Sequence, residues 1–190
     1  GASPAGTVTV DATTSAPNAG DVAAQLAADR DWTVDADDVA ALNALGAVRL
    51  YVSEETDTLD LLDTLATSVG GYLTVDASGT LRISRLTAPV DPVVTLHDYE
   101  IIDIQRSATG AGDNGLPLGK VTLNADRIET VQTDLNGNVS DARRARLAQQ
   151  TRPVSAVRAA TQTRHPLAGE ITVDSVLANR SQARTIADDL

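Results

Sequence analysis

Two histidines, His97 and His165, are the residues best suited to acid–base or metal chemistry near neutral pH. They lie 68 residues apart, and neither has a second histidine at the spacing that lets one helix hold a metal ion. His97 stands beside Asp98 and Tyr99 at the start of a predicted strand, whereas His165 precedes Pro166, which keeps it extended. Since no motif surrounds either residue, we interpret both as structural histidines.

A nucleophilic serine or a carboxylate pair is the next kind of chemistry to consider. Ser68, His97 and an aspartate are the residue types of a serine-hydrolase triad, but the sequence has no Gly-x-Ser-x-Gly elbow to present the serine. Glu54 and Glu55 are adjacent, and neighbours in an extended chain point to opposite faces. The chain has no cysteine, which excludes a thiolate nucleophile, disulfides and cysteine-bound zinc. We therefore predict no catalytic residue and a protein that is not an enzyme.

Oxygen ligands at alternate positions of residues 134–141 resemble the start of a calcium-binding loop. An EF-hand loop needs its sharp-turn glycine at position 6 and a bidentate glutamate at position 12. Here the glycine falls at position 4, and Ala145 occupies position 12. The sequence therefore predicts an Asn-Gly turn followed by a capped helix.

The other acidic and glycine-rich clusters also have structural interpretations. Asp35, Asp37 and Asp38 are typical of a helix start, where the helix dipole favours carboxylates. Gly70-Gly71 and the 110–115 stretch lack the spacings that cradle phosphates, so both are predicted turns. We predict no metal-binding residue, no cofactor-binding residue and no cofactor.

The charge of the chain argues against a nucleic-acid partner. The 190 residues contain 26 Asp and Glu against 15 Lys and Arg, a formal net charge of −11. Neutralising phosphates needs clustered basic residues, and the cluster of Arg143, Arg144 and Arg146 lies beside Asp141 in a predicted helix. We interpret that cluster as a solvated helix face and predict no specific nucleic-acid binding.

The composition predicts a core of Val, Leu, Ile and Ala, because Met and Phe are absent. Trp32, Tyr51, Tyr72 and Tyr99 are the only aromatic residues, and we expect some of them to be buried. No apolar run approaches the ~18 residues of a membrane helix, so no membrane span is predicted. The first residue is not Met and the helical pattern of residues 181–190 ends without a stop signal, which favours a fragment of a larger protein.

Hydrophobic periodicity predicts an α+β fold, built mostly of antiparallel β hairpins or small barrel-like modules with several short packed helices. Thr56 or Asp57 is the expected cap of the best-defined helix, and residues 77–79 form a hairpin turn. The predicted helices span residues 21–28, 35–45, 57–69, 141–150 and 183–190. The predicted strands span residues 48–52, 72–76, 80–86, 100–104, 120–123, 128–132, 154–163 and 170–174.

Three parts follow along the chain. Residues 1–19 are a predicted flexible lead, and residues 20–90 are a helix-plus-hairpin module. Residues 91–190 are a second β-rich module with helices, expected to pack on the first and to be truncated at its C-terminus.

One stretch of the sequence carries a family resemblance. It reads Thr58-Leu-Asp-Leu-Leu-Asp-Thr-Leu-Ala-Thr-Ser-Val-Gly-Gly71, followed by Tyr72-Leu-Thr-Val-Asp-Ala-Ser-Gly-Thr-Leu81. This stretch, within residues 51–86, resembles a recurring segment of the bacteriophage tail proteins that form the hub at the distal end of the tail tube. Weaker similarity follows the same order at residues 32–35, 119–124, 130–132, 164–168 and 183–190.

The resemblance implies a non-enzymatic structural protein of the phage tail tip or baseplate hub, located in the virion. Such proteins normally form a trimeric ring that continues the tail tube and lets DNA pass, with other tail proteins as partners. An acidic lumen would repel phosphates, so DNA would slide without sticking. Family members are usually much longer, which agrees with the fragment interpretation.

Two alternatives stay open at this point. A non-catalytic host-recognition or carbohydrate-binding β module would also lack catalytic motifs, although four aromatic residues are few for a sugar platform. A tail-associated hydrolase would need His97 or His165 in a pocket beside a carboxylate.

Overall fold

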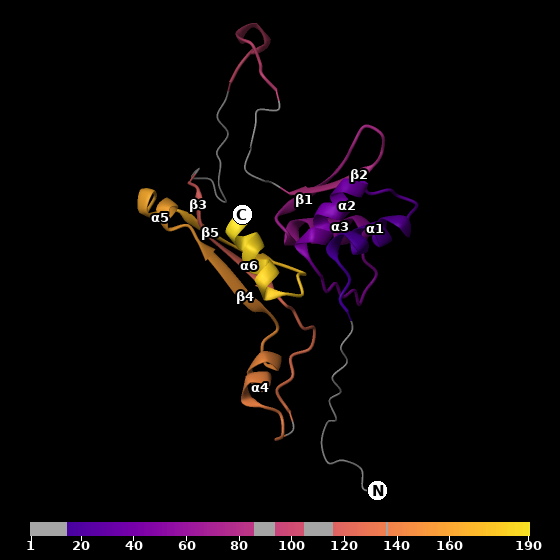
Figure 1. The fold of residues 1–190 in the computed structure, drawn as a ribbon, viewed down its shortest axis with the longest axis vertical. Coiled ribbons are helices and arrows are strands. Elements are labelled where there is room, and N and C mark those ends of the chain that lie inside the picture. The colour runs from indigo at the N-terminus through magenta and orange to yellow at the C-terminus, as the bar shows by residue number, and fades with distance from the viewer. Residues whose placement is uncertain (1–14, 86–93, 105–115, 136) are drawn as a thin grey trace.

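The computed structural model describes residues 15–85, 94–104, 116–135 and 137–190, and its elements confirm the predicted α+β class (Figure 1). An N-terminal lobe and a C-terminal lobe lie side by side, and residues 94–104 extend away from both. The N-terminal lobe contains α1 (Ala19–Ala28), α2 (Ala36–Leu45), α3 (Thr58–Ser68), β1 (Gly71–Val75) and β2 (Leu81–Arg85). The C-terminal lobe contains β3 (Leu118–Ala125), α4 (Asp141–Leu147), β4 (Arg152–Val157), α5 (Ala159–Arg164), β5 (Gly169–Asp174) and α6 (Arg180–Asp189).

Side-chain caps start two of the N-terminal helices where the sequence predicts. The Asp35 carboxylate accepts hydrogen bonds from the backbone N–H groups of Asp37 and Asp38, at 3.0 and 3.2 Å. The Asp57 carboxylate accepts one from the backbone N–H of Leu59 at 2.9 Å, so Asp57 rather than Thr56 caps α3. Each cap satisfies donors that the first helical turn leaves free.

The apolar stripe of α3 packs on the β1–β2 hairpin, as predicted. Leu62, Leu65, Ala66 and Val69 are fully buried, but Leu59, predicted in the same stripe, is exposed near the helix start. Gly70 at φ +72° ends α3 in a conformation that residues with a Cβ rarely adopt. The chain can therefore turn directly from the helix into β1.

The C-terminal lobe is a three-stranded sheet with the strand order β4-β3-β5, and α6 packs on it. β3 pairs antiparallel with β4 and parallel with β5. Val121 and Leu123 on β3 are buried with Ala183 and Ile186 of α6. Between these buried positions, Thr122 on β3 shares a hydrogen bond with Ser155 of β4 at 2.8 Å. This alternation is typical of a sheet with one face packed and the other solvated.

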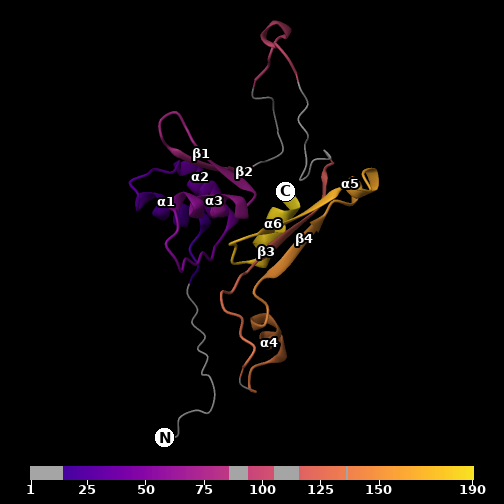
Figure 2. The ribbon, with the colours of Figure 1, turned by 180° about the vertical axis from the view of Figure 1, so that it is seen from behind.

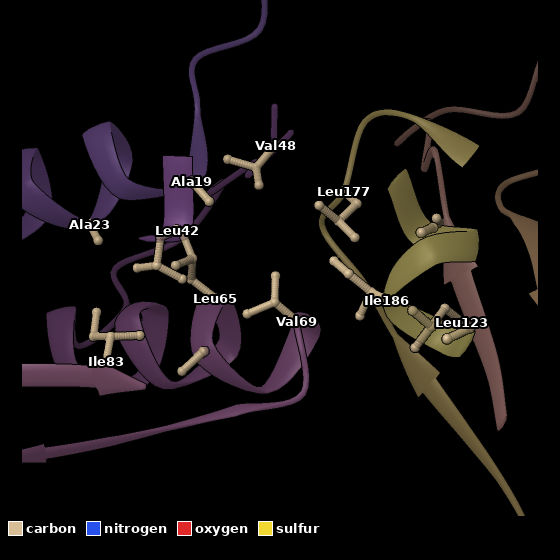
Figure 3. Packing of buried hydrophobic residues seen from close by; sticks show 14 of the residues in the cluster. Ala19, Ala23, Leu42, Val48, Leu65, Val69, Ile83, Leu123, Leu177 and Ile186 are labelled. Atoms are coloured by element: carbon tan, nitrogen blue, oxygen red, sulfur yellow. The ribbon is translucent and has the colours of Figure 1, made fainter. Parts of the chain in front are cut away.

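The two lobes join along an interlobe seam formed by residues 47–49 and 175–178. The backbone N–H of Arg49 donates to the Val176 carbonyl at 2.7 Å, and the N–H of Ala178 donates to the Ala47 carbonyl at 2.9 Å. Val48 and Leu177 pair at the centre of the seam, and both are buried. Figure 3 shows these side chains between the apolar residues of the two lobes, which form one continuous core.

Three predicted strands are wrong. Residues 48–52 make one bridge, at Val48, because the seam gives them only the short segment 175–178 as a partner. Residues 98–100 form a 3-10 helix, η1 (Asp98–Glu100), and residues 101–104 are in no strand. Residues 128–132 are irregular, and their backbone N–H groups donate to the carbonyls of Leu147, at the end of α4, and of Gln150 instead of to a neighbouring strand.

Other boundaries also differ from the predictions. The predicted strand 154–163 divides into β4 and α5 at Arg158, and the predicted helix 141–150 ends at Leu147. The two sheets have two and three strands, and both are open rather than barrel-like. The predicted 110–115 loop, most of the 1–19 lead and the 90/91 module boundary fall outside the described residues. Within the described ranges, no helix has the length and apolarity that crossing a bilayer requires.

Candidate functional site

The two histidines lie in different parts of the molecule. His97 caps η1 on the exposed segment 94–104, and its ring stacks on Tyr99 with centroids 5.4 Å apart. His165 ends α5 in the C-terminal lobe and lines a surface hollow. No group of three or more His, Cys, Asp or Glu that could hold a metal ion occurs among the described residues.

Ser68 has a structural role in the fold. Its hydroxyl donates to the Leu65 carbonyl one turn earlier at 2.8 Å, and the residue is fully buried. Its own carbonyl accepts a hydrogen bond from the Ser175 hydroxyl at 2.9 Å, across the two lobes. The fold therefore separates Ser68 from the exposed His97, and the triad of Ser68, His97 and an aspartate does not form.

Of the acidic residues considered as metal ligands, Asp38 has other partners and Asp134 belongs to the predicted turn at residues 134–141. Asp38 is nearly buried, and its carboxylate accepts from the Arg82 guanidinium at 2.7 and 3.2 Å and from the Ile83 backbone N–H at 3.1 Å. Asp134 is exposed and Leu135 is buried, while residue 136 lies outside the described residues. Asp38 thus ties α2 to β2.

The expectation that some aromatic residues are buried is wrong. Trp32, Tyr51, Tyr72 and Tyr99 are all exposed, and they come from four separate segments of the chain. The core is aliphatic, as the composition predicts, so packing does not need the rings. Their exposure makes them available for contacts with other molecules.

The most organised polar cluster, which we call the Asp126 cluster, consists of Asp126, Arg49, Arg146 and Arg152. Asp126 follows β3, is 4% exposed and has φ +52°, a conformation that Asp tolerates better than most residues. Its carboxylate accepts from Arg49 Nη1 at 2.6 Å and from Arg152 Nε at 2.6 Å. Arg146 Nη2 donates to the Asp126 carbonyl at 2.6 Å and lies 3.1 Å from Oδ1.

The cluster holds three parts of the chain together. Arg49 comes from the seam, Arg146 from α4 and Arg152 from β4, while the Asp126 backbone N–H donates to the Leu177 carbonyl at 2.8 Å. Burial opposes ionisation of Asp126, but the hydrogen bonds from Arg152 and Arg146 outweigh it, so the pKa of the carboxyl lies below its ordinary value. The carboxylate is therefore charged at neutral pH and satisfied by its arginines.

The sequence did not predict this cluster. Its arginines lie 20 to 77 residues from Asp126 along the chain, and no motif spacing connects them. The interpretation of residues 143–146 as a solvated face is wrong for two arginines. Arg144 donates to the Val139 and Leu135 carbonyls, and Arg146 turns inward to Asp126. The only sequence signal was the number of arginines on a helix with almost no apolar stripe.

Large apolar side chains are exposed to solvent on the segment 94–104, which we call the arm. It has eleven residues but carries five of the fourteen exposed large apolar side chains found in the part of the chain that the structure describes. Tyr99 is 84% exposed and Ile102 is fully exposed, and both views show the arm extending away from the lobes (Figure 2). The five side chains are Val94, Leu96, Tyr99, Ile102 and Ile104.

Two surface hollows are relevant to binding. One, of about 300 Å³, lies at α5 and is lined by Pro117, Ala160, Thr161, Arg164 and His165. The other, of about 440 Å³, lies between α2 and β2, and its lining includes apolar side chains of both elements together with Asp38.

No protein-family model matches the chain, and no curated protein matches it.

Proposed function

We propose that this chain is a structural component of a phage, or phage-derived, tail tip or baseplate hub. It assembles into a ring, most simply a trimer, that continues the tail tube and lets DNA pass, with other tail proteins as partners in the virion. The resemblance of residues 58–81 to hub proteins supports the tail role. Assembly itself is supported by one structural observation, the concentration of exposed apolar side chains on the arm.

The distribution of charge fits a ring around DNA. Residues 15–85 contain twelve acidic and four basic side chains, whereas residues 116–190 contain eight acidic and ten basic ones. An acidic N-terminal lobe facing the lumen would repel the DNA backbone. The more basic lobe would then face neighbouring protein subunits.

The test is the mass of the particle. Light scattering over a hundredfold range of concentration, on this chain and on a version extended beyond Leu190, is expected to show a closed trimer in at least one sample. Negative-stain images of that sample should show rings with a central channel. A monomer in both samples at every concentration contradicts the proposal.

The second candidate is a non-catalytic host-recognition or carbohydrate-binding module. Its support is the exposure of all four aromatic side chains, since exposed rings are what a sugar platform needs. Trp32 is the only tryptophan, so its fluorescence reports on one site. Saturable quenching of this fluorescence by an oligosaccharide, in a protein that remains monomeric, would favour the binding module over the hub.

A further inference from the structure

We propose that the arm of one copy docks on the α5 corner (residues 157–168) of a second copy. This inference rests on the proposed function and adds to it the two surfaces that meet. The arm offers apolar side chains and negative charge, and the α5 corner offers a hollow, apolar side chains and positive charge.

The chemistry of the arm is that of a docking segment. Its eleven residues include Asp98, Glu100 and Asp103 but no Lys or Arg. Tyr99 lies between two of these acids, Asp98 and Glu100, in η1, and it is 84% exposed. Exposed tyrosine is enriched among the residues that dominate binding energy at protein interfaces.

The α5 corner has the complementary chemistry. Residues 157–168 contain Arg158 and Arg164 and no carboxylate. Leu167 is 80% exposed and Val157 is also exposed, beside the hollow lined by Arg164. The Arg158 guanidinium makes a long hydrogen bond, 3.4 Å, to the Asp188 carbonyl, and a neutral carbonyl does not neutralise its charge.

Charge favours the α5 corner over the other hollow. The larger hollow between α2 and β2 lies in the acidic lobe, and its charged lining residues are Asp38 and Arg85. An arm with three carboxylates would meet a carboxylate as well as a guanidinium there, so this hollow offers less charge complementarity. At the α5 corner the same carboxylates meet Arg158 and Arg164.

The geometry of such a contact allows a ring. The arm and the α5 corner are different surfaces, so each copy can give its arm to one neighbour and receive an arm from the other. A head-to-tail contact of this kind closes into a ring when its rotation permits. The contact would also cover the exposed apolar side chains of both surfaces.

The absence of cysteine from the sequence permits a direct test. Copies with Tyr99→Cys are mixed with mass-tagged copies with Leu167→Cys and oxidised gently. A disulfide requires Cα atoms about 4.4–6.8 Å apart, so a mixed disulfide reports contact between the arm and the corner. The matched control replaces Leu167→Cys by Val75→Cys, an exposed apolar position on β1. Equal yields of mixed disulfide for the two pairs would overturn the docking inference.

An assembly measurement gives an independent readout. Tyr99→Ala is expected to weaken self-association at least ~30-fold, the effect of losing an interface hot spot. Tyr51→Ala removes an exposed tyrosine away from the arm and should leave association unchanged. Arg164→Glu should also weaken association, and Arg164→Glu combined with Glu100→Arg should restore part of it.

The outcomes separate the inference from the proposed function. Rings that form equally well with Tyr99→Ala and with the unchanged chain would overturn the docking of the arm and leave the hub proposal standing. A chain that remains monomeric in every sample would overturn both. Loss of rings with Tyr99→Ala but not with Tyr51→Ala, together with the mixed disulfide, supports the arm and the α5 corner as the contact.

Discussion

The Asp126 cluster and the arm place opposite kinds of side chain in surroundings that normally disfavour them. In the cluster, a carboxylate is buried, and its own chain supplies three guanidinium groups around it. In the arm, large apolar side chains are exposed to solvent, and both views show the backbone of the arm extending away from the two lobes. A buried charge is tolerated when its partners are present, so the cluster is complete within one copy. The apolar side chains of the arm stay exposed among the described residues of one copy, which is why we look for a surface that covers them in a second copy.

The largest expected effect comes from leucines in the two regions. Leu177 is fully buried in the seam, and Leu177→Ala should lower the free energy of unfolding by about 2–5 kcal/mol through lost burial and a cavity. Leu96 is 58% exposed on the arm, and Leu96→Ala should change it by less than about 0.5 kcal/mol. Urea denaturation at a concentration where the protein is monomeric measures both. Similar losses for the two variants would mean that the arm packs on its own lobe.

Removing the charge of the cluster should have the next largest effect. Asp126→Asn keeps a residue that accepts the positive φ but leaves three arginines without their shared carboxylate. Because the arginines are partly solvated, we expect a loss of about 1–3 kcal/mol, below the cost of breaking a fully buried pair. The control, Asp188→Asn, alters an exposed carboxylate and should cost far less. Equal losses in the free energy of unfolding for the two variants would show that the burial of Asp126 adds nothing to the stability of the fold.

The pKa of Asp126 gives this stabilisation a pH dependence. Burial disfavours the charged carboxyl, yet hydrogen bonds from Arg152 and Arg146 lower its pKa in the folded state below the ordinary 3.8. A carboxyl with a depressed folded pKa stabilises the fold above its unfolded value and loses that contribution as the pH falls through the folded value. The stability difference between the unchanged chain and Asp126→Asn should therefore be constant near neutral pH and shrink below pH 3.8.

Urea denaturation of both proteins at a series of pH values measures this difference. Asp76 also has a lowered pKa, mainly through the hydrogen bond from the Ser78 hydroxyl, but it is present in both proteins and its effect cancels. A difference that grows on acidification would contradict the assigned role of the arginines.

Local patterns in the sequence predict much of the fold. Capping carboxylates at Asp35 and Asp57 and the positive-φ glycines at Gly70 and Gly79 act within a few residues, so helix starts and the hairpin turn are readable. The strand predicted at residues 48–52 failed for a non-local reason. Alternation shows that a segment suits a sheet, but whether a neighbouring strand exists depends on distant residues.

The candidate surfaces were less predictable for the same physical reason. Asp126 meets Arg49 across 77 residues, and no local spacing reports such a contact. The apolar residues between 100 and 104 predicted a strand, because sequence alone does not distinguish an apolar side chain that will be buried from one that will stay exposed. The interpretation of His97 and His165 as structural histidines, which rests on the strict spacing rules of chelation, stays a prediction.

The smallest expected effect distinguishes surface ion pairs from the Asp126 cluster. Arg184 lies 3.2 Å from Asp188 one turn along α6, with both side chains about half exposed. Arg184→Gln should change the free energy of unfolding by no more than about 0.5 kcal/mol, and less in high salt, because water screens an exposed pair. Arg49→Gln removes a donor from the nearly buried Asp126 and should cost about 1 kcal/mol or more. If urea denaturation gave the same small value for both, the Arg49 contact would be an ordinary surface pair that adds little to the joining of the two lobes.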